Sequence, residues 1–436
     1  MFRSTFFACL LCTLGLYATL PVFAADETSL TIEITKGREK AFALALVPFD
    51  VGNGVDLRED MFAIVKNNVA ISGQISSLDS LPALPLTMSD IVYEDWQQAE
   101  AEFILLGRIR KDPGGKFRIE YSLHDVYGGR TLRSETLFFN QASIRDTAHF
   151  LSDLVYEEIT GLKGIFSTRI AYITIQGKRS QNPIFRLQIS DIDGMRPQVL
   201  LVSRQPIISP SWSPTGNQIA YVSFERGTSN IFVQNLVSGK RSLISSFRGI
   251  NSAPDWSPDG RRIALVLSRQ ENTDIFLLDL ATGKTTRITD DPRIDTEPSW
   301  SRDGQRLLFT SERTGTPHIF EADLKRQTIT QLTFKGKYNA RPRYVENGRA
   351  FAYIYQGESG FKLVKQSFVN DEIVELSRYF EDESPSVAPN GNAIVYSTKV
   401  RGKSTLVVVS SDGQVEYQLP TTSNEIIEPA WSNFRI

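Results

Sequence analysis

One short motif recurs through the carboxyl-terminal part of this 436-residue chain at intervals of 43 or 44 residues. Each copy begins with proline, and tryptophan is its third residue in four of the six copies. The six copies are Pro210-Ser211-Trp212, Pro254-Asp255-Trp256, Pro298-Ser299-Trp300, Pro342-Arg343-Tyr344, Pro385-Ser386-Val387 and Pro429-Ala430-Trp431. Repeats of about 40 to 45 residues that hold several strands are typical of β-propeller blades. The spacing therefore predicts a propeller.

A single repeat contains the material for one blade. Between Gly260 and Pro298, two apolar runs at Arg262–Ser268 and Asp274–Leu280 have the length of strands and not of helices. Turn sequences separate these runs, and a shorter strand follows at Thr286–Thr289. With the strand that carries the motif, each repeat makes a four-stranded antiparallel meander. The predicted fold of this part is an all-β six-bladed β-propeller with WD40-like blades.

The two ends of the repeat array predict how the ring closes. The last copy of the motif stops at residues 431–434 without further strands, whereas three strands at 169–174, 184–189 and 198–202 lack a motif before them. Joined together, the two fragments make one complete blade, which a strand at about residues 429–434 closes. Closure would remove exposed sheet edges, which otherwise invite aggregation. We therefore assign residues 166–436 to the propeller.

The first residues are typical of a secretory signal peptide. Arg3 precedes an apolar run from Phe6 to Leu20, and Val22-Phe23-Ala24 offers small residues for cleavage. We expect residues 1–24 to be removed after Ala24, although an uncleaved membrane anchor is the alternative. Cys9 and Cys12 would leave with the signal, so the mature protein would hold no cysteine, which suits an exported protein with a large core.

Residues 25–165 follow a different pattern, which predicts a small α/β domain. Expected elements are a strand at 41–49, helices at 57–69 and 89–101, strands at 103–110, 116–126 and 131–138, and a helix from Ser143 to Gly161. We expect Ser143 and Asp146 to form a capping box at the start of the last helix. At the beginning of the domain, Leu30, Ile32 and Ile34 alternate with polar residues, so segment 25–36 is flexible or forms a strand. Whether that strand pairs with its own sheet or with a partner is open at this point.

Catalytic signals are weak in this sequence. The histidines His124, His149 and His318 are too scattered for a metal site or a triad, and no nucleophile elbow occurs. Asp191-Ile192-Asp193-Gly194 resembles half of a calcium loop, but the later glutamate is missing and a turn is favoured. The net charge of -2 gives no basic face for nucleic acid. We predict no catalytic, cofactor-binding or metal-ligating residues.

The segments that precede the six motifs form the strongest candidate for a binding surface. They must all open on one face of the ring, around the axial channel, where loops on a rigid scaffold favour recognition. These segments are Arg204–Ser209, Phe247–Ala253, Arg293–Glu297, Lys337–Arg341, Tyr379–Ser384 and Ser423–Glu428. They mix apolar side chains such as Ile250 and Tyr338 with many carboxylates. We interpret them as a protein-docking face, with ordinary solvated loops as the alternative.

The signal, the small α/β domain and the blades together resemble the TolB family, the periplasmic component of the Tol-Pal system. The likeness covers essentially the whole chain. The residues that carry it are Val47-Pro48-Phe49, Ser203-Arg204-Gln205-Pro206-Ile207 before the first motif, Thr296-Glu297-Pro298, and Asp382-Glu383-Ser384-Pro385-Ser386. Tyr344 and Val387 depart from the pattern where a blade tryptophan is expected.

The resemblance implies a non-enzymatic periplasmic adaptor that serves outer-membrane integrity and its invagination during cell division. It would bind the lipoprotein Pal through the propeller face and the inner-membrane protein TolA through the amino-terminal segment. The Pal-side residues would be Ile250, Ala253, Thr296, Glu297, Tyr338, Asp382 and Glu383, and the TolA-side residues would be Leu30, Ile32 and Ile34. We further expect a monomer that reaches membranes only through partners, other outer-membrane proteins among them, and binds no nucleic acid.

Two other classes of function stay open on the sequence alone. The acidic loops would also suit a periplasmic propeller enzyme, or a binding module, that acts on glycans or peptides. Alternatively, carboxylates in the channel would hold a cation, the one cofactor for which the sequence leaves room.

Overall fold

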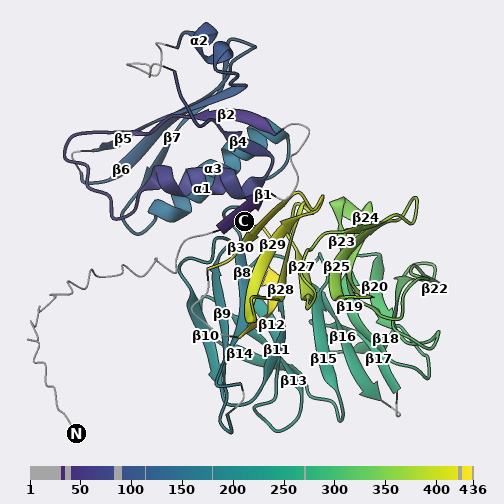
Figure 1. Cartoon of the computed structure of the whole chain (residues 1–436). Coiled ribbons are helices and arrows are strands. Elements are labelled where there is room, and N and C mark those ends of the chain that lie inside the picture. Colours follow the sequence, from purple (N-terminus) through teal and green to yellow (C-terminus); the bar gives the residue numbers. More distant parts are fainter. Residues whose placement is uncertain are drawn as a thin grey trace, which may run out of the picture.

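The computed structural model describes residues 31–34, 41–82, 91–112, 114–178, 180–269, 272–420 and 425–434. Figure 1 shows a small domain of helices and one sheet above a larger ring of sheets. In these described parts no helix has the length and apolar character needed to cross a membrane. Residues 1–24, the expected cleavage point after Ala24, and Leu30 lie outside the described residues.

The amino-terminal domain is built on one mixed sheet with strand order β4-β2-β5-β6-β7, and β3 pairs with β5. Its strands are β2 Phe42–Leu46, β3 Asp50–Val51, β4 Ile75–Ser77, β5 Phe103–Lys111, β6 Phe117–Asp125 and β7 Arg130–Phe139. Strand β2 runs parallel to β4 and β5, whereas β5, β6 and β7 form an antiparallel meander. The helices are α1 Met61–Ser72, α2 Tyr93–Gln98 and α3 Ile144–Thr160.

Local signals explain where the two long helices begin and end. Asp60 caps α1 by accepting from the amide of Ala63 at 3.2 Å, and Gly73 ends the helix with φ of 63°. Helix α3 ends at Gly161 with φ of 71°, as its sequence predicts. The predicted capping box was wrong: Ser143 is the N-cap residue but makes no side-chain cap. Asp146 instead binds Arg196 of the propeller at 2.8 Å, because a guanidinium offers a charged partner.

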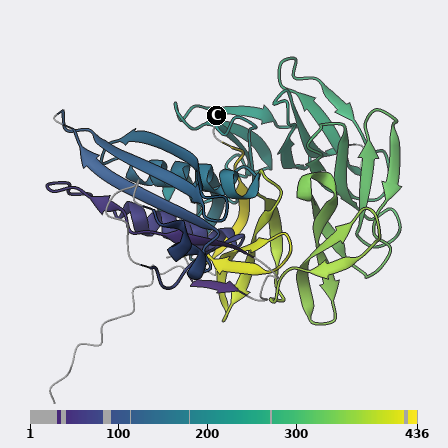
Figure 2. The same cartoon turned by 90° about the horizontal axis from the view of Figure 1, so that it is seen from above.

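The rest of the chain forms six four-stranded antiparallel sheets arranged in a ring, which confirms the predicted six-bladed propeller (Figures 1 and 2). The first blade consists of β8 Arg169–Gln176, β9 Ile184–Asp191, β10 Gln198–Ser203 and β31 Ile426–Trp431. The second blade consists of β11 Ile207–Trp212, β12 Gln218–Ser223, β13 Asn230–Asn235 and β14 Arg241–Ser245. The third blade consists of β15 Asn251–Trp256, β16 Arg262–Arg269, β17 Asn272–Asp279 and β18 Thr285–Arg287. The fourth blade consists of β19 Asp295–Trp300, β20 Arg306–Ser311, β21 His318–Asp323 and β22 Thr328–Gln331. The fifth blade consists of β23 Asn339–Val345, β24 Ala350–Gly357, β25 Gly360–Ser367 and β26 Ile373–Glu375. The sixth blade consists of β27 Glu383–Val387, β28 Ala393–Val400, β29 Lys403–Ser410 and β30 Val415–Gln418.

The ring closes as the repeat array predicts. Strand β31, the last of the chain, pairs antiparallel with β8, the first strand of the propeller. In this register Ala430 faces Ala171 and Trp431 faces Ile170. The indole Nε1 of Trp431 also donates to Thr168 Oγ1 at 2.8 Å. The first blade is therefore made from both ends of the propeller sequence.

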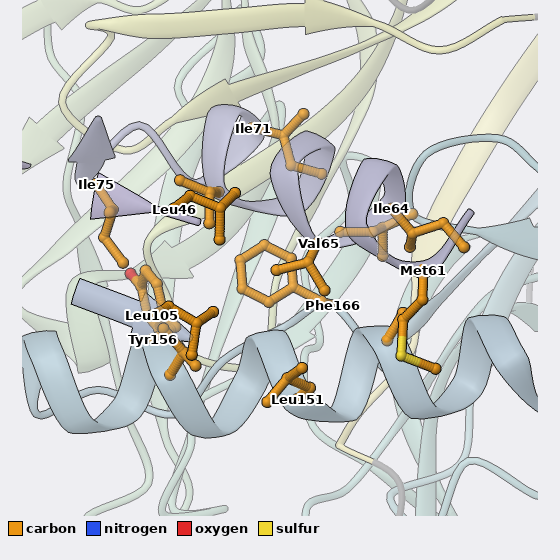
Figure 3. Packing of buried hydrophobic residues seen from close by; sticks show 14 of the residues in the cluster. Leu46, Met61, Ile64, Val65, Ile71, Ile75, Leu105, Leu151, Tyr156 and Phe166 are labelled. Atoms are coloured by element: carbon orange, nitrogen blue, oxygen red, sulfur yellow. The ribbon is translucent and has the colours of Figure 1, made fainter. Parts of the chain in front are cut away.

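The two domains share one continuous hydrophobic core. Its buried members include Met61, Val65 and Leu151 from the amino-terminal domain and Tyr417 and Trp431 from the propeller. The segment that joins the domains takes part in this core as well. In Figure 3 the ring of Phe166 lies between helix α1 and helix α3, and its edge meets Tyr156 with ring centroids 5.7 Å apart. The connection is thus packed into the core and is not a free linker.

Asp153 of α3 holds the backbone of this connection. Its carboxylate accepts from the amides of Phe166 at 2.7 Å and Ser167 at 3.1 Å. Burial raises the pKa of Asp153 to about 6, although these hydrogen bonds oppose the rise. The folded protein therefore binds a proton at Asp153 between about pH 4 and pH 6, where the unfolded chain has already released it.

This shift predicts a pH effect on stability. A raised carboxyl pKa means that stability falls as pH rises through the window from about 4 to 6. Between pH 5 and pH 7.5 this group should remove about 1 kcal/mol from the free energy of unfolding. Urea denaturation of wild type and Asp153→Asn at both pH values measures the effect. The difference between the free energies of unfolding at the two pH values should change by about 1 kcal/mol in the variant. The same difference in the variant and wild type would contradict the assignment.

The amino-terminal strand β1 Thr31–Ile34 does not join the sheet of its own domain. It pairs antiparallel with β30, the outer strand of the sixth blade, where Ile32 is opposite Tyr417 and Ile34 is opposite Val415. Figure 2 shows this short strand beside the last blade. The question that the alternating pattern left open is therefore answered for this state: the strand adds to the propeller of its own chain.

Candidate protein-docking face

Each of the six inner strands carries the same irregularity just before its motif. The residue before the motif proline has φ between 46° and 57°, in the left-handed region, and the register of the strand shifts at this point. The six residues are Ser209, Ala253, Glu297, Arg341, Ser384 and Glu428. None is glycine, so the conformation has an energetic cost that the blade must meet. All six line the axial channel, a cavity of about 790 Å³ between the inner strands.

Arg341, the one cation among these six residues, pairs with both carboxylates, Glu297 and Glu428. Arg341 Nε lies 3.1 Å from Glu297 Oε1, and Arg341 Nη1 lies 3.3 Å from Glu428 Oε1 and also donates to Ser384. The backbone amide of Arg341 donates to the other oxygen of Glu297 at 2.9 Å. Burial alone would lower the pKa of Arg341, but these carboxylates outweigh burial and raise the pKa above its usual value. One guanidinium therefore links strands β19, β23, β27 and β31 within the channel.

The next layer of the channel contains another carboxylate. Asp255 accepts from the backbone amide of Trp300 at 2.9 Å and from the hydroxyl of Ser211 at 3.4 Å. Burial raises the pKa of Asp255, and the charge of Arg343 opposes the rise. These channel carboxylates thus already have protein partners, and the channel cation for which the sequence leaves room is untested.

Exposed apolar side chains lie at the end of the ring where the inner strands begin. Phe247, Ile250, Ile294, Phe361 and Phe380 are each between 37% and 49% exposed. The half-buried Tyr338 packs edge-on against Phe361, with ring centroids 5.2 Å apart. We call the surface formed by these six residues the docking face. Five of them come from the loops before the inner strands of blades three to six, and Phe361 lies at the start of β25. Exposed apolar side chains at one end of a ring are a candidate protein interaction site.

The structure brings most of the predicted Pal-side residues to this end of the ring. Ala253, Thr296 and Glu297 line the channel beside the docking face, and Ile250 and Tyr338 belong to the face itself. Glu383 is exposed at the start of β27.

Asp382 differs from the others because its side chain is fully buried. Its carboxylate accepts from the amide of Leu363 at 2.8 Å and from the hydroxyl of Ser377, so it holds the loop before β27 and is not available for contact.

Several residues of this site escaped the sequence reasoning. Phe361 lies at the β24–β25 hairpin, outside the segments that precede the motifs. Phe247 and Ile294 lie within those segments but were not singled out. Arg341 occupies the same repeat position as Ala253 and Glu297. Aligning the repeats on their prolines would have identified it as a channel residue.

The three histidines all have local structural partners. His124 contacts Tyr93 and Ser122 in the amino-terminal domain, at 3.1 Å and 2.8 Å. His318 contacts Thr333 and Asn339 within the propeller, at 3.2 Å and 3.0 Å. His149 lies between the two domains, next to Asp191 at 3.6 Å. None of them lines the channel.

Fold and site together define a class: a two-domain protein in which a small α/β module is fused to a six-bladed β-propeller with an open face around its channel. Models of two families match the chain, the TolB beta propeller domain over residues 156–435 and the TolB amino-terminal domain over residues 30–132. The chain belongs to the TolB family of Tol-Pal system proteins.

Individual relatives match over almost the whole length. The Tol-Pal system protein TolB of Marinomonas sp. is 51% identical over 427 residues, which cover 97% of this chain and 98% of the relative. That of Nitrosococcus oceani is 53% identical over 405 residues, 92% of this chain and 93% of the relative. The crystal structure of TolB from Acinetobacter baumannii superposes with a TM-score of 0.83 at 36% identity, and covers 93% of this chain and all of that one. The names of these relatives state no enzymatic activity.

Proposed function

We propose that this protein is a non-enzymatic periplasmic adaptor of the Tol-Pal system. Its docking face binds the outer-membrane lipoprotein Pal, and its segment 25–36 binds the inner-membrane protein TolA. In this way it serves outer-membrane integrity and the invagination of that membrane during division. The observation that carries the proposal is the set of exposed apolar side chains at the end of the propeller where the inner strands begin.

The chemistry of the face favours a protein partner over a small substrate. Apolar side chains such as Ile250 and Phe380 supply contact area that a partner can remove from water. Next to them, Glu297 and Glu428 are both tied to Arg341. Cleavage of glycans needs a carboxyl pair in which one group is free to donate a proton. Because both carboxylates pair with Arg341, the ring supports an adaptor more than a glycan-cleaving enzyme.

The amino-terminal strand supports the second half of the proposal. Strand β1 pairs with the outer strand of the sixth blade over four residues, which is a small contact. Strands added to an open sheet edge can exchange with other chains. We propose that this segment alternates between the propeller and TolA, and that Pal binding biases the equilibrium by about 1 to 3 kcal/mol. Ile32 and Ile34, with Leu30 before them, remain the proposed TolA-side residues.

The cellular setting follows from the same proposal. A signal peptide removed after Ala24 would deliver the chain to the periplasm as a monomer. Contact with membranes would then arise only through partners, Pal, TolA and other outer-membrane proteins among them, without nucleic acid.

A pair of matched substitutions tests the docking face. Ile250→Asp places a charge among the apolar side chains of the face, whereas Val237→Asp changes a residue that is 90% exposed in the β13–β14 turn. Desolvating the new carboxylate should weaken binding of a purified Pal domain at least about 10-fold for Ile250→Asp only. Titration calorimetry measures the affinity, and circular dichroism checks that both variants fold. Equal affinities of both variants and wild type would overturn the proposed face.

A further inference from the structure

A buried ionic cluster joins the first blade to the amino-terminal domain. Arg145, in the first turn of α3, is 6% exposed. Its Nε lies 3.2 Å from Asp191 Oδ2, its Nη2 contacts Asp193, and its Nη1 lies 3.2 Å from Glu59 Oε2. Asp191 and Asp193 belong to the turn after β9 that resembles half of a calcium loop. That turn therefore presents its carboxylates to an arginine of the other domain.

A second arginine crosses the interface in the opposite direction. Arg196 of the propeller lies 2.8 Å from Asp191 Oδ2 and 2.8 Å from Asp146 Oδ1 of α3. Although burial alone would raise it, contacts with His149 and Arg196 hold the pKa of Asp191 well below its usual range. Asp191 is thus ionised at neutral pH and shared between both arginines, so separating the domains would break the pairs Arg145–Asp191 and Arg196–Asp146.

The same residues do not form a metal site in this arrangement. His149, Asp191 and Asp193 lie close enough to surround a cation, and His149 Nε2 has no hydrogen-bond partner in the described residues. Yet Arg145 already lies between the two carboxylates, and Arg196 binds one of them. The two positive charges are supplied by the protein itself.

The cluster extends from α3 to helix α1. The side-chain amide of Asn68, fully buried on α1, donates to His149 Nδ1 at 3.0 Å and to Ser152 Oγ at 2.9 Å. Since Nδ1 accepts a hydrogen bond, the ring proton lies on Nε2 and faces Asp191. Helix α1 is therefore held through α3 to the turn of the first blade.

The far end of α1 touches the strand that receives β1. At Gly73, where the helix ends, an added Cβ would lie 2.4 Å from Cγ2 of Val415. Val415 is the first residue of β30 and is opposite Ile34 of β1. A contiguous set of contacts thus leads from the ionic cluster, through α3 and α1, to the pairing of β1 with β30.

We propose that the cluster of Arg145, Asp191, Asp193 and Arg196 is an interdomain clamp that holds α1 against β30 and thereby keeps β1 on the propeller. Opening the clamp moves α1 away from Val415 and weakens the pairing of β1. Its regulatory meaning rests on the proposed exchange of segment 25–36 with TolA. The structural part is independent of any partner.

The test compares two double variants without a partner present. Arg145→Met with Asp193→Asn removes the interdomain pairs of Arg145 with Asp191 and Asp193, while Asp191 keeps Arg196 as a partner. Arg118→Met with Glu120→Gln removes a pair within β6. Hydrogen exchange of the β30 amides that pair with β1, and trypsin cleavage at Lys36, Arg38 and Lys40, should accelerate at least about 10-fold in the first variant only. Arg196→Met, at a more exposed residue, is a milder second variant, for which the same change in direction is expected.

Unchanged exchange and cleavage in a folded Arg196→Met chain would overturn the clamp, as would unchanged values in the folded double variant. This failure is distinguishable from failure of the proposed function. If a Pal domain does not bind wild-type protein, the clamp can still control β1. If a Pal domain binds, the clamp can still fail to control β1.

Discussion

Deleting residues 429–436 is expected to lower the melting temperature by about 10 °C or more. The deletion removes the end of β31, including Trp431, which is 5% exposed and donates to Thr168 Oγ1. Loss of a buried tryptophan alone costs about 3 to 5 kcal/mol, and each kcal/mol corresponds to about 2 to 4 °C in a domain of this size. The deletion also exposes the edge of β8, which invites aggregation. Differential scanning calorimetry measures the loss.

Two control variants distinguish the loss of ring closure from the effect of a shorter chain alone. Removing only residues 435–436 keeps all of β31 and should melt as wild type does. Trp431→Ala keeps the backbone pairing with β8 and should lie between the two. A chain without residues 429–436 that melts at the wild-type temperature would show that β31 does not close the ring.

Replacing Arg341 by alanine is expected to destabilise the protein by about 2 kcal/mol at pH 7.5. The substitution leaves the carboxylates of Glu297 and Glu428 in the channel without the cation that they share. Breaking a fully buried pair costs about 3 to 5 kcal/mol, and the channel is open enough to water to reduce that figure. Urea denaturation of the variant and wild type gives the difference in free energy of unfolding.

Adding Glu428→Gln to Arg341→Ala should restore part of the stability, because fewer charges oppose one another. Arg302 also lines the channel but contacts the side chain of Asn347, so Arg302→Ala should have little effect. A loss of equal size for Arg302→Ala would mean that the ionic ring has no special role.

The parts of the fold that repeat could be predicted, because repetition reports on local strand and turn chemistry. The Pro-x-Trp motifs predicted the blades, the face shared by the preceding segments, and the closing strand. Strand β31 pairs with β8 as expected. The single elements were harder. The partner of β1 is an outer strand of the sixth blade nearly four hundred residues away, and alternation of Ile32 and Ile34 says nothing about which edge is available.

Tertiary ion pairs and hydrogen bonds account for the remaining errors. Asp146 has the right spacing for a capping box, yet it binds Arg196 of another domain. Asp382 lies among exposed acidic residues in the sequence, but its carboxylate is buried against Leu363 and Ser377. The turn predicted at Asp191 is present, and Arg145 pairs with its carboxylates. For Asp146 and Asp382, the deciding partners lie outside the local pattern from which their roles were predicted.

The left-handed residue before each proline separates backbone shape from side-chain chemistry. Serine, alanine, glutamate and arginine all adopt this conformation in one ring, with φ between 46° and 57°. The bulge, and not the identity of the residue, therefore fixes the geometry. Exchange of Ser209 or Ala253, which take no part in the ion pairs of Arg341, would change the size or charge of one sector of the channel while the bulge stays in place. A propeller built in this way can acquire a new binding specificity at such positions, whereas Arg341, which links four strands, is constrained by stability.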